Sequence, residues 1–175
     1  FKIGISNFKK IKLINSKTFD AFKKQRPKIS NKFIVLLDDF FEHPSSIKLR
    51  GKIEPGQIKK HYFLLNKFLY KIKNTLKKKI VICIHPRDNL NKKKKIFKNF
   101  NVIQYQTQKY IYQSFLIMFF DTTSIIDGVN LKKKMLAIYS DYNDENVKYH
   151  IKGYEKNLSI KSHQISNLNF TKRNI

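Results

Sequence analysis

Short apolar runs alternate with amphipathic stretches along the chain from residue 33 onward. Runs of this kind predict strands, because short apolar segments with many β-branched side chains suit strands that are buried on both faces of a parallel sheet. Five strands are expected from these runs, at 33–37, 80–84, 101–104, 115–120 and 135–139.

The stretches between the predicted strands have helical periodicity. The longest, 57–77, places apolar residues three and four positions apart and has lysines on the opposite side. Shorter helices are expected at 92–95, 108–113, 125–131 and 143–154. This alternation of strands and helices predicts the α/β class, as a Rossmann-like doubly wound parallel sheet.

The alternation places one domain at 33–155, with a segment on either side. Residues 1–32 are basic, contain Pro27 and lack sustained periodicity, so we expect a linker or the remnant of a preceding domain. The chain begins with Phe1 rather than Met, so we expect further residues upstream and an incomplete chain. Residues 156–175 are predicted to form a polar C-terminal tail.

The net charge of +25 could indicate an anionic partner. However, all but four of the 37 basic residues are lysine, whereas proteins that bind nucleic acids rely heavily on the bidentate fork of arginine. Lys, Asn, Ile, Phe and Tyr are abundant together, while Gly, Pro, Ala and Arg are scarce, which favours AT-rich codon usage. We therefore expect no nucleic acid partner, and we retain peripheral contact with an anionic membrane.

Location in the cell is suggested by three features of the sequence. No run approaches the roughly 18–20 apolar residues that a membrane-spanning helix needs. No signal peptide is recognisable at the start of the sequence. The single cysteine, Cys83, has no partner for an internal disulfide, which suits a reducing compartment. We expect a cytoplasmic protein that can lie at the inner face of the plasma membrane.

Polar clusters follow three of the predicted strands. We name them the acidic pair (Asp38-Asp39), the histidine turn (His85-Pro86-Arg87) and the hydroxyl segment (Thr122-Thr123-Ser124). In a doubly wound sheet, ligands bind outside the carboxyl ends of the strands. The three clusters are therefore expected at one edge of the sheet, where they could contact one ligand.

The hydroxyl segment and the histidine turn both suit a phosphate group. The hydroxyl segment joins a strand to a helix, where free backbone N–H groups and hydroxyls favour an anion; the alternative is a plain helix N-cap. In the histidine turn, the imidazole of His85 and the guanidinium of Arg87 suit a diphosphate or a phosphate with a carboxylate. The alternative is a surface turn in which Pro86 ends the strand.

The acidic pair could supply a general base or hold a sugar hydroxyl. The alternative interpretation is that the two aspartates are solvated acids that only end the strand. Adjacent side chains of an extended chain point to opposite faces, so at most one of Asp38 and Asp39 would face a given ligand. The aspartates do not form an Asp-x-Asp motif, and no histidines have metal-ligand spacing. No glycine-rich phosphate loop occurs either. We expect no metal and no cofactor.

Three stretches, FIVLLDDFFEHP, KKIVICIHPRDN and FNVIQYQTQKYIYQSFLIMFFDTTSIIDGVNLKKKMLAIYS, together resemble bacterial surface-carbohydrate biosynthesis proteins of the GT-B glycosyltransferase type. The resemblance covers about residues 33–142 and is strongest to sialyltransferases and polysialyltransferases. It implies that His85 and Pro86 form the donor-binding HP motif, and that Thr123 and Ser124 form the later hydroxyl pair. It also implies metal-independent, inverting transfer from a nucleotide sugar, such as a CMP-linked one, to a glycan or glycolipid of capsule or lipopolysaccharide.

The sequence departs from this family at three points. Phe40 stands where the acidic motif usually ends in glycine, and Lys134-Met135 stands in place of a lysine-proline pair. Residues 1–32 are too few for the acceptor-side domain, so the chain would be the donor-binding C-terminal half. Two alternatives stay open: a sugar-nucleotide epimerase of the same architecture, and a basic non-enzymatic module that binds membrane or nucleic acid.

Overall fold

The computed structural model describes residues 30–39, 41–42, 54–143 and 145–175. Most of the N-terminal segment predicted as a linker or domain remnant (1–32) lies outside the described residues, as does most of the loop predicted after the first strand.

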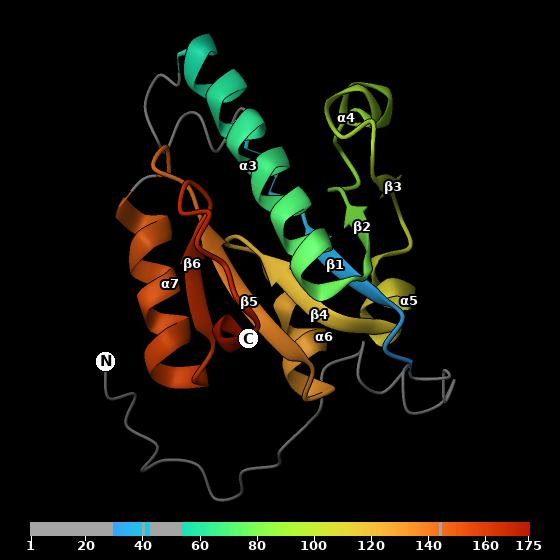
Figure 1. Cartoon of the computed structure of the whole chain (residues 1–175), viewed down its shortest axis with the longest axis vertical. Coiled ribbons are helices and arrows are strands. Elements are labelled where there is room, and N and C mark those ends of the chain that lie inside the picture. Colours follow the sequence, from blue (N-terminus) through green and yellow to red (C-terminus); the bar gives the residue numbers. More distant parts are fainter. Residues whose placement is uncertain (1–29, 40, 43–53, 144) are drawn as a thin grey trace, which may run out of the picture.

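Within the part of the chain that the structure describes, six parallel strands form one sheet in the order β3-β2-β1-β4-β5-β6 (Figure 1). The strands are β1 (Phe33–Leu37), β2 (Lys79–Cys83), β3 (Asn101–Ile103), β4 (Ser114–Phe119), β5 (Lys134–Tyr139) and β6 (Lys161–Gln164). The predicted Rossmann-like α/β class is confirmed. The strand order reverses direction between β1 and β4, and ligands of such sheets bind at this switch point.

Helices cover both faces of the sheet. They are α3 (Pro55–Leu76), α4 (Leu90–Ile96), α5 (Thr107–Tyr112), α6 (Ile125–Asn130) and α7 (Glu145–Leu158), with a 3-10 turn η2 (Lys172–Asn174) near the end of the chain. The core beneath α3 and α4 is separate from the core beneath α5, α6 and α7. Figure 1 shows α3 crossing in front of the sheet. Among the described residues, no helix is both long and apolar enough to cross a membrane.

Successive side chains along a strand point to opposite faces of the sheet, so a single strand can contribute to both cores. In β1, Ile34 and Leu36 face α3, whereas Val35 and Leu37 face the other layer. The apolar stripe of α3 fits the first core, and its Phe68 is fully buried. Each such buried side chain is worth roughly 1.5–3 kcal/mol relative to an exposed one, so burial of this stripe holds α3 on the sheet.

Gly128 allows α6 to pack closely beneath β4 and β5. A Cβ at this position would lie 2.8 Å from Cδ1 of Ile117 and 3.1 Å from Sδ of Met135. The absence of a side chain therefore lets the helix approach the sheet, which fixes the position of the connection that carries the hydroxyl segment.

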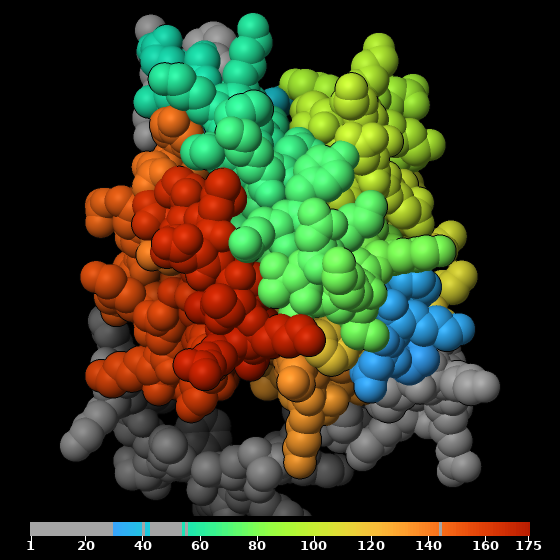
Figure 2. All heavy atoms as spheres, viewed as in Figure 1, coloured from blue at the N-terminus to red at the C-terminus, as the bar shows by residue number. Residues whose placement is uncertain are grey.

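The prediction of a polar tail at 156–175 was wrong, because this segment belongs to the domain. Helix α7 continues to Leu158, and β6 pairs in parallel with β5. The polar sequence of β6 reflects its edge position, yet it buries His163, whose ring stacks on Phe68 with centroids 5.1 Å apart. Phe170 is also buried against Phe68, and Figure 2 shows α3 and the C-terminal residues packed side by side.

Candidate functional site

The structure brings all three predicted polar clusters to one edge of the sheet. The acidic pair follows β1, the histidine turn follows β2 and the hydroxyl segment follows β4, and these three strands are neighbours. Because β1 pairs in parallel with both β2 and β4, the carboxyl ends of these three strands share an edge. The clusters therefore flank the switch point between β1 and β4, which confirms the predicted placement.

The histidine turn is held by the chain that follows β3. Nε2 of Gln104 donates to the carbonyl oxygens of Pro86 at 2.9 Å and Asp88 at 3.0 Å. The hydroxyl of Tyr105 also donates to the Pro86 carbonyl, at 3.0 Å. With its carbonyls occupied, the turn has a fixed backbone and presents an exposed Arg87 to solvent.

The imidazole of His85 has a defined orientation within this turn. Its Nδ1 accepts a hydrogen bond from the backbone N–H of Arg87 at 3.1 Å. A neutral imidazole that accepts at Nδ1 carries its proton on Nε2. His85 can therefore act as a donor through Nε2, which is the role that a phosphate oxygen requires.

The hydroxyl segment forms a turn before α6. The Oγ1 of Thr122 accepts from the backbone N–H of Ser124 at 3.3 Å, so this hydroxyl is used locally. Ser124 occupies the N-cap position but its side chain makes no capping hydrogen bond. The side chains of Thr123 and Ser124 are exposed, so two hydroxyls at this edge can contact a ligand.

The two aspartates of the acidic pair differ in burial, as expected for neighbours in an extended chain. Asp38 is buried and Asp39 is partly exposed. Asp38 belongs to a buried cluster that also contains Tyr62, Asp88 and Lys93. Nζ of Lys93 donates to Oδ2 of Asp38 and to the Tyr62 hydroxyl, each at 2.5 Å, and lies 3.2 Å from Oδ2 of Asp88. The side chains of Lys93 and Asp38 are each 1% exposed. In this arrangement Lys93 of α4 contacts both Asp38, which follows β1, and Tyr62 of α3, and Asp39 is the acid closer to solvent.

Burial governs the electrostatics of the buried cluster. It raises the pKa of Asp38 to about 6, although the nearby Lys93 ammonium acts in the opposite direction. For Lys93, burial lowers the pKa, but the Asp38 carboxylate and the Tyr62 hydroxyl more than offset this and hold it above its usual value. Burial and the Asp38 charge also raise the pKa of Tyr62. Lys93 is therefore charged at neutral pH.

Lys93 was missed by sequence reasoning, which interpreted the lysine run 92–95 as part of a short helix and singled out none of its members. A signal was present in the helical spacing. Lys93 comes three residues after Leu90 and four before Phe97, so it shares their apolar face. A lysine in such a position is buried only when it is paired, and Asp38 and Asp88 provide that pairing.

Comparison of the chain with protein-family models gives no match, and comparison with curated proteins gives none either. Within the described residues, no group of three or more His, Cys, Asp or Glu side chains is arranged to hold a metal ion.

Proposed function

We propose that this domain binds the nucleotide of an activated sugar at its carboxyl edge, as the donor-binding half of a glycosyltransferase of surface polysaccharide biosynthesis. One observation carries the proposal: the histidine turn and the hydroxyl segment lie on either side of β1, at the switch point of the sheet. A switch point at this edge is where nucleotides bind in doubly wound sheets.

The side chains at this edge are suited to a phosphate. His85 can donate through Nε2, Arg87 is an exposed cation, and two hydroxyls of the hydroxyl segment are exposed. Charge-assisted hydrogen bonds from such groups are stronger than neutral ones. They would stabilise negative charge on the nucleotide phosphate as it leaves the sugar, and His85 would supply its proton. We propose a CMP-linked donor on the resemblance of the sequence to sialyltransferases.

Calorimetry with CMP, CDP, UDP and ATP tests this proposal. A cytidine or uridine nucleotide should bind more tightly than ATP, and His85→Ala and Ser124→Ala should each weaken its binding. Loss of one hydrogen bond to a charged group costs roughly 1.5–3 kcal/mol, which is about tenfold or more in affinity. Equal binding of all four nucleotides, or unchanged binding in both variants, would contradict the proposal.

Two controls separate the site from the basic surface. Thr75 lies in the last turn of α3, and Asn99 lies just before β3, so both are near the amino edge of the sheet. Thr75→Ala and Asn99→Ala should leave nucleotide binding unchanged. The measurements should be repeated at several salt concentrations, because non-specific attraction to a chain with a net charge of +25 is screened by salt.

We propose further that the protein works in the cytoplasm and contacts the inner face of the plasma membrane. Lys60, Lys67 and Lys71 lie on one exposed stripe of α3. Basic residues close to an anionic surface contribute about 1 kcal/mol each. Sedimentation should show binding to vesicles of phosphatidylcholine with phosphatidylglycerol and none to phosphatidylcholine alone. Equal binding to both would contradict membrane attraction by charge.

A further inference from the structure

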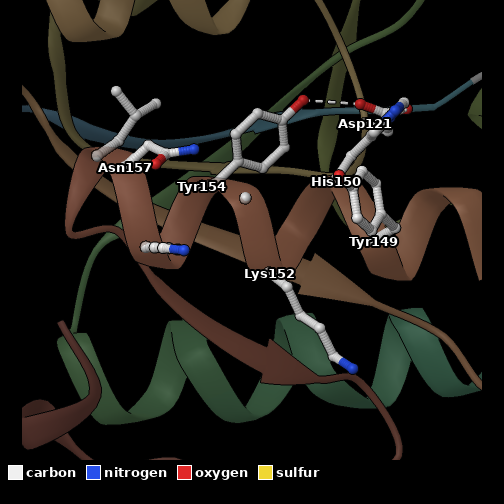
Figure 3. A pocket seen from close by; sticks show the side chains of 9 residues that line it. Asp121, Tyr149, His150, Lys152, Tyr154 and Asn157 are labelled. Carbon is white, nitrogen blue, oxygen red and sulfur yellow. Dashed lines mark hydrogen bonds and ion pairs between the residues drawn. The ribbon is translucent and has the colours of Figure 1, made fainter. Parts of the chain in front are cut away.

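A further polar cluster, separate from those described above, connects the end of β4 to α7. Nδ1 of His150 lies 2.7 Å from Oδ2 of Asp121, and the hydroxyl of Tyr154 donates to Oδ1 of Asp121, also at 2.7 Å. We call these three residues the groove cluster. Figure 3 shows the Tyr154 hydroxyl pointing at Asp121, with His150 beside it. The cluster lies outside the three groups that the sequence singled out.

The groove cluster is open to solvent. The side chain of His150 is 50% exposed and that of Asp121 is 28% exposed. Both line a groove of about 770 Å³ along α7, together with Tyr149 and Tyr154. Gly153 also lines the groove, and a Cβ there would meet nothing within 4 Å. The groove therefore has room for a ligand directly beside the imidazole.

The hydrogen bonds of Asp121 define the protonation of His150. Both carboxylate oxygens accept, one from Tyr154 and one from the imidazole. The neutral ring must then carry its proton on Nδ1, which leaves the lone pair of Nε2 as a proton acceptor. No described residue forms a hydrogen bond with Nε2. A carboxylate that fixes the tautomer of a histidine in this way is the arrangement of a general base.

We propose that His150 is the general base of the transfer reaction and that Asp121 is its positioning residue. The inference rests on the proposed function. Nε2 of His150 takes the proton from a hydroxyl of a glycan acceptor, and the acceptor oxygen forms a bond to the anomeric carbon of the donor sugar. The bond from that carbon to the nucleotide phosphate breaks, and its electron pair leaves with the phosphate.

The location of the groove cluster supports this role. Asp121 directly precedes the hydroxyl segment, so the same connection after β4 carries the proposed donor contact and the carboxylate that orients His150. The exposed ring of Tyr149 and the ring of Tyr154 give the groove aromatic faces, on which the apolar face of a sugar can pack. Asp38, in contrast, is buried and paired with Lys93.

Nitrogen NMR of the histidine rings in the full chain tests the geometry without any substrate. At a pH where the ring is neutral, His150 should carry its proton on Nδ1. Asp121→Asn should move the proton to Nε2, because the new amide can donate to Nδ1. A proton on Nε2 in the wild type would overturn the assignment of His150 as a base.

Turnover of CMP-N-acetylneuraminic acid, with water in place of the acceptor, tests the chemistry. His150→Gln should lower turnover by about 100-fold or more, as expected for loss of a general base. The matched control is Ser162→Ala, which removes the 2.6 Å hydrogen bond from Ser162 to Glu155 and so also removes a contact between α7 and the sheet. Turnover of His150→Gln equal to that of the wild type would show that His150 only anchors α7.

Calorimetry with CMP separates failure of this inference from failure of the proposed function. His150→Gln should bind CMP with the affinity of the wild type, because the donor contacts assigned above do not include His150. If the wild type neither binds CMP nor hydrolyses the donor, the proposed function fails, and the tautomer measured by NMR alone decides whether His150 is poised as a base.

Discussion

Two clusters of similar composition lie at the carboxyl ends of neighbouring strands, and they differ in burial. Each has an aspartate that follows a central strand, a nitrogen group from a helix and a tyrosine. In the buried cluster, Asp38 and Lys93 are each 1% exposed. In the groove cluster, Asp121 is 28% exposed and His150 is 50% exposed. The ion pair of the first is closed to a ligand, whereas the second cluster is open to one.

This difference in burial means that the buried cluster matters for stability, whereas the groove cluster is free to take part in chemistry. A buried ion pair is costly to desolvate, and removal of one partner leaves an uncompensated charge in the interior. The buried cluster is therefore important for the fold around β1, α3 and α4. An exposed pair is worth only about 0–1 kcal/mol, so the groove cluster can change without loss of the fold. Substitutions in the two clusters should separate accordingly.

The largest effect is expected for Lys93→Met. It removes the cation and leaves Asp38 buried beside Asp88, which should cost about 3–5 kcal/mol of unfolding free energy at neutral pH. Denaturant titration would measure this cost. Lys94→Met is the matched control, since Lys94 is an exposed neighbour on the same helix and its loss should cost less than about 0.5 kcal/mol. Similar losses in both variants would show that the buried pair does not support the fold.

The titration of Asp38 should have the next largest effect. Its pKa of about 6 in the folded protein lies above the ordinary 3.8, so the folded state holds a proton that the unfolded state has released. Relative to Asp38→Asn, the wild type should lose stability as pH rises from about 4 to about 6. The loss amounts to at most about 3 kcal/mol. Stability measured across this window should show the difference in slope, and parallel pH profiles would contradict it.

A smaller change, an increase in stability, is expected for a substitution in the groove. Gly153 lies within α7, where glycine is less favourable than alanine by roughly 0.5–1 kcal/mol. Because the space beside it is open, Gly153→Ala should raise the unfolding free energy by about that amount. Thermal unfolding would measure the gain. A loss of stability would show that the groove is closed, in conflict with the contrast between the two clusters.

Much of the fold could be predicted because its signal is local. The apolar runs of β1, β2 and β4 and the periodicity of α3 each depend on neighbouring residues. β6 could not be predicted in this way. It is a short edge strand of sequence KSHQ, and its burial of His163 depends on Phe68 of α3 and on Phe170.

The candidate site was predictable only in part, for a related reason. The three polar clusters follow apolar runs, so parallel strands bring them to one edge. The two clusters compared above depend on packing between distant segments. Lys93 contacts Asp38 across 55 residues and His150 contacts Asp121 across 29, and such pairs depend on where each helix docks on the sheet. For Lys93 the apolar face of its helix gave a hint, but no local pattern marks His150.

The proposed nucleotide site is tested most directly by mapping CMP onto the domain with two-dimensional NMR of its backbone amides. The largest shifts should occur in the histidine turn and the hydroxyl segment, with Asp121 beside them. Residues at the amino edge, such as Lys79, Asn101 and Lys134, should be unaffected. Shifts centred on the amino edge, shifts scattered over the lysine-rich surface, or the absence of any shift would contradict the central claim that the carboxyl edge is a nucleotide site.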